Sequence, residues 1–322
     1  MSHPLHIQLF ILGGTIAMAG SDGAVPTLDA EALLRGVPEA VRARLQIQVR
    51  AVANVPSAGL DFHTIIGVAR DIAGSRADGS VVVQGTDTME ETAFALDLML
   101  GAQARTVVTG AMRPADRPGA DGPANLTAAL LTAAMPGLTG RGVVVVMNEE
   151  IHAARFVEKR HTTAPNAFVS PGHAAIGAVV EQQVKFEGLV RRPPCLGVPK
   201  TAPPPVALYE ACFDEDARVL ARLPDCGYRG AVVAAFGGGH LSQSQAEAAA
   251  QLSQHMPVIL CSRCGAGWVL QDSYAYPGSE RDLIAKGLVW GGLYRPRHAR
   301  LMVALALAAG RPRDQLSDLF QN

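Results

Sequence analysis

Short apolar runs separated by polar and glycine-rich segments dominate the first half of the chain. Four of these runs, at residues 6–12, 80–84, 105–112 and 142–148, are mostly apolar and contain several β-branched residues. Runs of this length and composition are typical of strands that are buried on both faces of a sheet. Because they alternate with amphipathic segments, we predict a largely parallel sheet with crossover helices.

The segments between the apolar runs have helical periodicity. Apolar residues recur at helical spacing across residues 89–100, so this segment is expected to pack one face on the sheet. Pro123 is well placed as the first residue of another helix, where a missing N–H costs nothing. Residues 230–239, 257–263 and 298–310 repeat the alternation on a smaller scale. We therefore predict an α/β protein: a larger N-terminal domain with a largely parallel sheet flanked by helices, and a smaller α/β C-terminal domain.

A proline-rich stretch without helical period separates the two halves. A chain of 322 residues forms two domains more often than one, and such a stretch is a natural connection between them. We predict an N-terminal α/β catalytic domain at residues 1–190, a linker at residues 191–208 and a C-terminal domain at residues 209–322.

Composition and charge exclude several classes of partner. Hydrophobic residues make up 48% of the chain and charged residues 18%, which suits a globular protein with a sizeable core. The formal net charge is −1 and no long basic run occurs, so we expect neither nucleic acid nor a membrane surface as a partner. No apolar stretch approaches the roughly 20 residues that span a bilayer. The N-terminus has no secretory-signal pattern, and we expect a cytoplasmic location.

The five cysteines give a weak signal. Their odd number in a large chain without an export signal favours reduced thiols. Cys261 and Cys264 form a C-x-x-C pair after an apolar run, which leaves a redox or metal role open. No second pair of ligands stands nearby to complete a zinc site. We therefore expect no metal and no organic cofactor.

Two glycine-threonine motifs follow predicted strands, at the sheet edge where open α/β folds bind ligands. In the first, "GGTIA", Gly13 and Gly14 would let the backbone approach a small ligand, and Thr15 offers a hydroxyl. The glycines at 20 and 23 in the following "MAGSDGAVPT" suggest a mobile lid over residues 18–27. An ordinary strand-to-loop turn would also explain the first motif.

The second motif, "QGTDTMEETA", places several carboxylates at the start of a predicted helix. Asp87 or Thr88 can cap this helix, with Glu90 or Glu91 completing a capping box and suiting its positive end. Capping leaves Thr86 unexplained at the carboxyl edge of the sheet.

A threonine hydroxyl needs a base, and Lys159 in "RFVEKRHTT" is a candidate. A lysine acts as a base only when desolvation lowers its pKa, and a neighbouring acid would instead orient it. A solvated surface lysine is the alternative. Nucleotide binding is disfavoured, because neither G-x-G-x-x-G nor G-x-x-x-x-G-K-[ST] is present.

Taken together, these residues resemble the bacterial-type L-asparaginases, amidohydrolases that release ammonia from asparagine and, in some members, from glutamine. The resemblance runs nearly from end to end, through "GGTIA", "GTDTMEETA", "TGAMRPADRPGADGPANL", "VVVMNEEIHAARFVEKRHTT", "SPGHAAIG", "FGGGHL" and "LVWGGLYRPRHARLMV". Two threonine motifs in this order are far more specific than any single glycine pattern. The family also implies a larger N-terminal and a smaller C-terminal α/β domain.

The resemblance implies roles for individual residues. Thr15 matches the nucleophile that forms a covalent acyl-enzyme, and Thr86, Asp87 and Lys159 match a second triad that activates a hydroxyl or water. Backbone amides of Thr86 and Ala111 would form the oxyanion hole.

Substrate contacts are implied in the same way. Ser57 matches the serine that binds the substrate α-carboxylate, and Asp87 also receives the α-ammonium. Family members are commonly homotetramers built from dimers whose active sites are shared. Glu280 resembles the acidic residue that the partner donates.

Several positions depart from the family pattern. Gln84 stands where a histidine is usual before Gly-Thr-Asp-Thr, and Ala58 replaces a glutamine. The usual Gly-Asn-Gly-Asn turn ends here in His240, which either restores a polar contact or only satisfies a turn. No tyrosine lies between Thr15 and Ser57, where the lid normally carries one. As a hypothesis, Tyr274 or Tyr276 of a partner chain supplies that phenol and replaces the lid tyrosine.

These departures leave three functions open. The first is an asparaginase with glutaminase side activity, and the second is a hydrolase of another small amide. The amidase subunit of archaeal tRNA-dependent amidotransferases shares the motifs but carries an extra N-terminal domain, for which Thr15 comes too early. The third is a non-catalytic small-molecule-binding module. A homodimer or homotetramer is expected.

Overall fold

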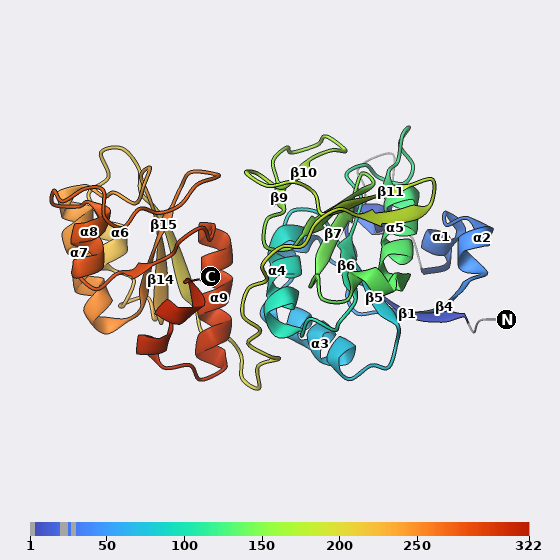
Figure 1. The fold of residues 1–322 in the computed structure, drawn as a ribbon, viewed down its shortest axis with the longest axis horizontal. Helices are drawn as coiled ribbons and strands as arrows, with labels where there is room; N and C mark the ends of the chain where they lie inside the picture. The colour runs from blue at the N-terminus through green and yellow to red at the C-terminus, as the bar shows by residue number, and fades with distance from the viewer. Residues whose placement is uncertain (1–3, 20–24, 27–29, 322) are drawn as a thin grey trace. The chain divides into compact units, whose positions relative to one another are not determined.

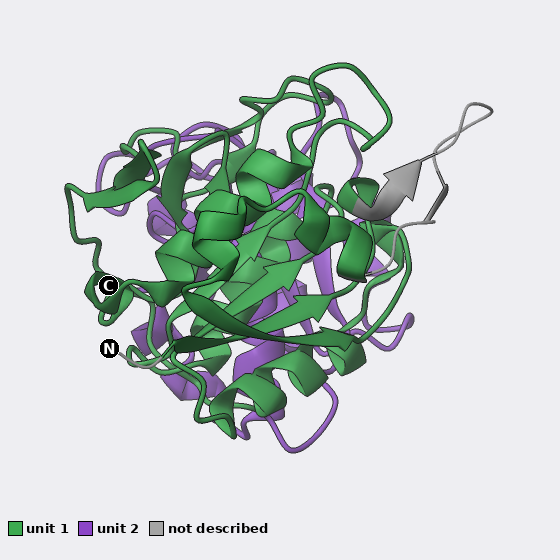
Figure 2. Cartoon of the chain, turned by 90° about the vertical axis from the view of Figure 1, so that its right-hand side faces the viewer, with its two compact units in different colours: residues 1–198 green, residues 199–322 purple. Residues whose placement is uncertain are grey.

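The computed structural model describes residues 4–19, 25–26 and 30–321. The chain divides into two compact units, residues 1–198 and residues 199–322 (Figure 2). Among the described residues, no helix combines the length and the apolar character that crossing a membrane requires.

Over its described residues, the first unit is built on one eight-stranded sheet. Its strands are β1 Leu5–Ile11, β4 Leu45–Ala51, β5 Gly79–Val83, β6 Thr106–Thr109, β7 Val144–Met147, β8 Glu150–Ala153, β11 Gly177–Val180 and β12 Gln183–Phe186. The strand order is β12-β11-β8-β7-β6-β5-β1-β4, and Figure 1 labels its parallel part from β7 to β4. The strands from β4 to β7 in this order are parallel, and β8, β11 and β12 are added by antiparallel pairs. The predicted parallel sheet is therefore confirmed, and each of the four predicted strands is present.

Helices cover both faces of this sheet. They are α1 Ala30–Arg35, α2 Glu39–Arg42, α3 Phe62–Ala73, α4 Met89–Met99 and α5 Gly122–Ala134. Ile7, Leu9 and Ile11 of β1 share one core cluster with Leu126 and Leu130 of α5. The intervening β1 side chains point to the other face, where α3 and α4 lie (Figure 1). Burial on both faces explains why the central strands β5, β6 and β7, which are buried at every position, are nearly continuous apolar runs.

The remaining elements of the first unit are short. Two-residue strands form two small antiparallel pairs, β2 Met18–Ala19 with β3 Val25–Pro26 and β9 Glu158–Lys159 with β10 Phe168–Val169. Single 3-10 turns are η1 Thr15–Ala17, η2 Ser57–Gly59 and η3 Pro136–Leu138. The predicted lid at residues 18–27 includes residues 20–24 and 27, which lie outside the described residues.

The second unit is a smaller parallel α/β domain. Its strands, in sheet order, are β13 Val206–Glu210, β14 Gly230–Ala235, β15 Val258–Ser262 and β16 Val289–Trp290. Its helices are α6 Arg218–Ala221, α7 Gln243–His255, α8 Glu280–Ala285 and α9 Pro296–Ala308, followed by the 3-10 turns η4 Arg313–Gln315 and η5 Ser317–Leu319. α9 lies on one face of the sheet, and α6 and α7 lie on the other (Figure 1).

The proline-rich stretch at residues 191–208 is not a free tether. Arg192 Nη2 lies 2.7 Å from Oδ1 of Asp97 on α4, and the backbone N–H of Leu196 donates to the Leu98 carbonyl at 2.7 Å. Burial raises the pKa of Asp97, and the Arg192 guanidinium opposes this rise. The stretch therefore begins as a segment packed on the first unit, and its last three residues belong to β13.

Candidate active site

The predicted site residues of the first unit gather at the carboxyl edge of its sheet. β1 lies between β4 and β5, so the chain adds β4 on one side of β1 and then crosses to add β5 on the other side, which reverses the direction of strand order. Open parallel sheets bind their ligands at such a switch point. Thr15 follows β1, Ser57 follows β4, Thr86 follows β5 and Ala111 follows β6.

Glycines allow these loops to touch. Gly14 has φ of +90°, and a Cβ on it would lie 2.1 Å from the backbone nitrogen of Gly85. A Cβ on Gly85 would in turn lie 2.9 Å from Oγ of Ser57. The sequence suggested that Gly13 and Gly14 admit a ligand close to the backbone, whereas in the structure they admit neighbouring loops. This contact between glycines sets Thr15 and Thr86, the next residue after each, on adjoining loops.

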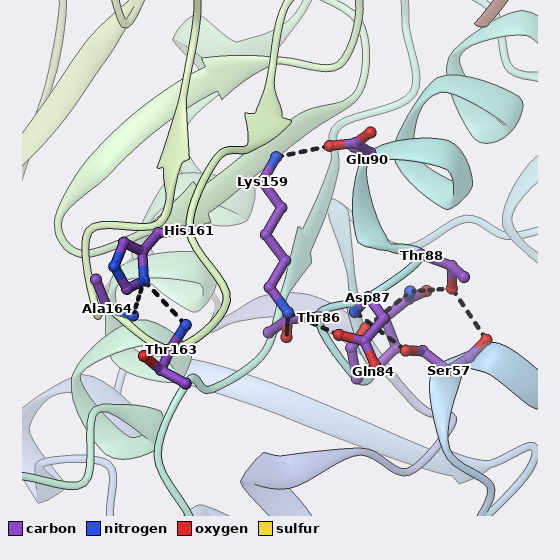
Figure 3. A network of polar contacts seen from close by, with 11 residues as sticks. Ser57, Gln84, Thr86, Asp87, Thr88, Glu90, Lys159, His161, Thr163 and Ala164 are labelled. Carbon is purple, nitrogen blue, oxygen red and sulfur yellow. Dashed lines mark hydrogen bonds and ion pairs between the residues drawn. The ribbon is translucent and has the colours of Figure 1, made fainter. Parts of the chain in front are cut away.

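Lys159 connects the second threonine to an acid (Figure 3). Its Nζ donates to Thr86 Oγ1 at 2.8 Å and lies 2.7 Å from Asp87 Oδ1. Thr86 is buried, the Lys159 side chain is 14% exposed and the Asp87 side chain is 73% exposed. The buried hydroxyl and the mostly buried ammonium are thus held together beneath a carboxylate that reaches solvent.

Ser57 holds the same loop from the other side (Figure 3). The backbone N–H of Asp87 donates to Ser57 Oγ at 3.1 Å, and the Thr88 hydroxyl donates to the Ser57 carbonyl at 3.0 Å. The predicted capping box is wrong: Thr88 is the N-cap of α4 but makes no side-chain cap bond. Its hydroxyl is occupied by Ser57, while Glu90 and Glu91 still suit the positive end of the helix.

Glu90 has a role that the sequence did not indicate. Its Oε2 accepts the backbone N–H of Lys159 at 2.6 Å, and its side chain is buried. One feature of the sequence could have pointed to this role: the first turn of this helix carries more carboxylates than capping requires.

The ends of β5 and β6 are tied by further polar contacts. The backbone N–H of Gln84 donates to the Thr109 carbonyl at 3.1 Å. Asn125 Nδ2 donates to the Gly110 carbonyl at 3.0 Å, directly before the fully buried Ala111. Gln84 is itself fully buried, and its Nε2 donates to the Gly85 carbonyl at 3.2 Å. Sequence reasoning assigned no role to Asn125, although it lies in the stretch "TGAMRPADRPGADGPANL" that carries the family resemblance.

In the second unit, His240 and Glu280 are brought together. Glu280 is fully buried, and its Oε1 accepts the backbone N–H groups of Ser273 and Tyr274 at 2.8 and 2.7 Å. His240 Nε2 lies 3.2 Å from Glu280 Oε2. Burial raises the pKa of Glu280, but the amide donors and His240 outweigh burial and leave this pKa below its usual value.

Tyr274 and Tyr276 surround His240. Their ring centroids lie 5.0 and 5.6 Å from that of His240, both in edge-on orientations, and both tyrosines are about half exposed. The backbone of His240 also closes its turn through paired bonds with Phe236.

The C-x-x-C pair is present as two free thiols. Burial raises the pKa of Cys261, whereas Cys264 is exposed. Among the described residues, no group of three or more histidine, cysteine or acidic side chains is placed to hold a metal ion.

Comparisons with known proteins show which protein family the chain matches. The family models for the N-terminal domain of asparaginase and for the glutaminase/asparaginase C-terminal domain match residues 6–191 and 205–320. The probable periplasmic L-asparaginase of Haemophilus influenzae is 30% identical over 98% of this chain and 93% of its own length. For L-asparaginase 2 of Escherichia coli the identity is 31%, over 98% and 92%.

A solved structure gives the same result. The probable cytoplasmic L-asparaginase of Campylobacter jejuni aligns with a TM-score of 0.87 and 29% identity, covering 98% of this chain and 99% of that one. Both units and nearly the whole length are thus accounted for, and the chain belongs to the bacterial-type L-asparaginase family of amidohydrolases.

Proposed function

We propose that this protein hydrolyses L-asparagine to L-aspartate and ammonia, with glutamine as a secondary substrate. The observation that carries the proposal is the contact of Lys159 Nζ with both Thr86 and Asp87, at the switch point where Thr15 stands on the adjoining loop. The similar proteins named above are called L-asparaginases, which agrees with this chemistry.

In the proposed reaction, Thr15 Oγ1 attacks the carbon of the side-chain amide. The C–N bond breaks, ammonia leaves with the proton of the threonine hydroxyl, and an acyl ester on Thr15 remains. Water then adds to the ester and releases aspartate and the free hydroxyl. Thr86, Asp87 and Lys159 activate a hydroxyl or water, and the backbone amides of Thr86 and Ala111 stabilise the oxyanion.

Ser57 and Asp87 are proposed to bind the two ends of the substrate backbone. Ser57 Oγ accepts the Asp87 amide, so its hydroxyl hydrogen is available for a carboxylate. The side chain of Asp87 is largely exposed, so its carboxylate can also bind the α-ammonium group of the substrate. A second candidate is hydrolysis of another small amide, which the neutral Gln84, the small Ala58 and the lack of a tyrosine between Thr15 and Ser57 favour.

We also propose that the protein is a homodimer or homotetramer and that a partner copy supplies His240, Glu280 and a phenol to each site. The half-exposed Tyr274 and Tyr276 beside His240 support this proposal. A cytoplasmic location is favoured by five free cysteines, since oxidising compartments favour disulfides. If Tyr274→Phe and Tyr276→Phe each keep full activity, neither phenol replaces the lid tyrosine.

The test is ammonia release from L-asparagine, L-glutamine and a panel of small amides. Hydroxylamine is added to trap an acyl-enzyme as the hydroxamate. We expect turnover of asparagine, loss of turnover in Thr15→Ala and Thr86→Ala, and normal turnover in Thr127→Ala, whose hydroxyl donates to the Pro123 carbonyl within its own helix. Activity on a different amide alone would favour the second candidate. Inertness on every amide would favour a binding module.

A further inference from the structure

Lys159 lies on a strand that is not part of the large sheet. β9 has two residues and, within the described residues, pairs only with the two residues of β10. An isolated two-stranded hairpin is at best marginally stable in water. The burial of Val157 and Phe168 anchors this hairpin, residues 158–169, but apolar packing is not directional. Polar contacts must therefore set the position of Lys159.

The first such contact is made by Glu90. Its buried carboxyl group accepts the Lys159 backbone N–H at 2.6 Å in a poorly solvated place, where hydrogen bonds are stronger than in water. Glu90 lies only four residues after Thr86, at the rigid start of α4. Lys159 is thus held twice by one short segment, because Glu90 in the first turn of α4 accepts its backbone N–H and Thr86 in the loop before α4 accepts from its Nζ (Figure 3).

The second contact holds the other strand. Ser170 directly follows β10, and its Oγ lies 3.0 Å from Nδ1 of the buried His152 on β8. His152 Nε2 lies 3.4 Å from Glu150 Oε2 without making a hydrogen bond, and this carboxylate favours the tautomer with the ring proton on Nε2. Nδ1 is then an acceptor for the Ser170 hydroxyl. Because β8 belongs to the large sheet, this bond joins the hairpin to the sheet.

We propose that Glu90 and His152 are positioning residues for Lys159: Glu90 clamps β9 to α4, and His152 clamps β10 to the sheet through Ser170. Together they hold the ammonium where it reaches the Thr86 hydroxyl and the Asp87 carboxylate at once. This proposal rests on the hydrolysis proposed above, because it assigns the clamps an effect on turnover.

A double-mutant cycle tests the action of Glu90 through Lys159. We expect Glu90→Ala to lower kcat by about ten- to a hundredfold, as small misplacements of catalytic groups do, with little change in KM. In the Lys159→Met background the same substitution is expected to change kcat less than twofold. An equal loss of kcat in both backgrounds would overturn the proposal.

Asp97 provides the matched control. It is an equally buried carboxylate of α4 that accepts a backbone amide, that of Val143 at 3.0 Å, away from the hairpin. Asp97→Ala should alter kcat by the same factor with or without Lys159. Glu90→Gln keeps an acceptor oxygen for the Lys159 N–H and should retain most of the turnover that Glu90→Ala loses. If Glu90→Ala does not fold, the double-mutant cycle and the exchange measurement are made with Glu90→Gln.

Hydrogen exchange measures the clamps without relying on catalysis. Exchange of peptides covering residues 155–170 should become at least tenfold faster in Glu90→Ala and in Ser170→Ala, and stay unchanged in Asp97→Ala. His152→Asn, whose amide oxygen can stand in for Nδ1, should keep the protection that Ser170→Ala loses. Unchanged exchange in both clamp variants would overturn the proposal even in a protein inactive on asparagine, whereas inactivity with intact exchange effects would contradict the proposed function alone.

Discussion

Replacing Gly14 by alanine should separate the loops that carry the two threonines. A Cβ at this position would lie 2.1 Å from the backbone nitrogen of Gly85 and 2.3 Å from its Cα, so no side-chain rotation relieves the clash. The φ of +90° adds backbone strain for any residue with a Cβ. Strain of about 1–3 kcal/mol and overpacking of about 1–3 kcal/mol together predict a loss of roughly 2–6 kcal/mol in the free energy of unfolding of the first unit.

The same displacement should reduce turnover more than it reduces binding. A shift of about 1 Å between Thr15 and Thr86 is expected to lower kcat on the order of a hundredfold. The assays are urea unfolding, analysed transition by transition because two units are present, and steady-state ammonia release from asparagine.

A glycine elsewhere in the unit controls for the substitution itself. Gly67 lies in α3, and a Cβ on it would meet nothing within 4 Å. Gly67→Ala should therefore stabilise the unit, by about 0.5–1 kcal/mol for a helix interior, and leave kcat unchanged. If Gly14→Ala kept both the stability and the turnover of the wild type, close contact between the β1 and β5 ends would not be what places the threonines.

Three further predictions concern charged and titrating groups. Lys159→Met should lower kcat by about 10²–10⁴-fold, the range for loss of a proton-transfer or orienting group, and steady-state kinetics with unchanged KM would check it. Burial, opposed by Glu150, holds the pKa of His152 below its ordinary 6.5, so as the pH drops below 6.5 the unfolded state binds the proton first and the folded state loses stability. His152→Gln should flatten this decline of the free energy of unfolding, measured by urea unfolding at several pH values. An equally steep decline in the variant would contradict the lowered pKa of His152. Arg192→Ala should destabilise the first unit by about 3 kcal/mol because it removes the ion-pair partner of the buried Asp97 carboxyl group, while kcat of the folded protein stays within twofold.

The sheet could be predicted from the sequence because its signal is local. Consecutive valines in a run bounded by polar residues indicate a strand buried on both faces, and each such run in the first unit is a strand. Pro123 likewise lies in the first turn of α5. The sequence could also place Thr15 and Thr86 at strand ends, and the parallel order puts those ends at one edge.

Contacts between distant segments were beyond pattern reasoning. Lys159 meets Thr86 across 73 residues, and only the resemblance to a family suggested that contact. The capping box failed for a tertiary reason, because Ser57 offers Thr88 a better partner than the helix start. His152 and Ser170 stand in two of the stretches that carry the family resemblance, but neither stretch indicated that these side chains meet, since a histidine in an apolar strand and a serine before a proline are both ordinary.

The site thus combines two means of placing its groups. Thr15 and Thr86 are positioned by backbone meeting backbone at Gly14 and Gly85, where no side chain intervenes. Lys159 is positioned by side chains, Glu90 above all, because within the described residues its hairpin forms no ladder with the large sheet. Substitution at the glycines should therefore cost stability and turnover together, whereas loss of the Glu90 contact should cost turnover with a smaller loss of stability. The ratio of the loss of turnover to the loss of stability should therefore be larger in Glu90→Ala than in Gly14→Ala. This difference distinguishes the rigid carboxyl edge of the sheet, which holds the threonines, from the more adjustable hairpin, which holds Lys159.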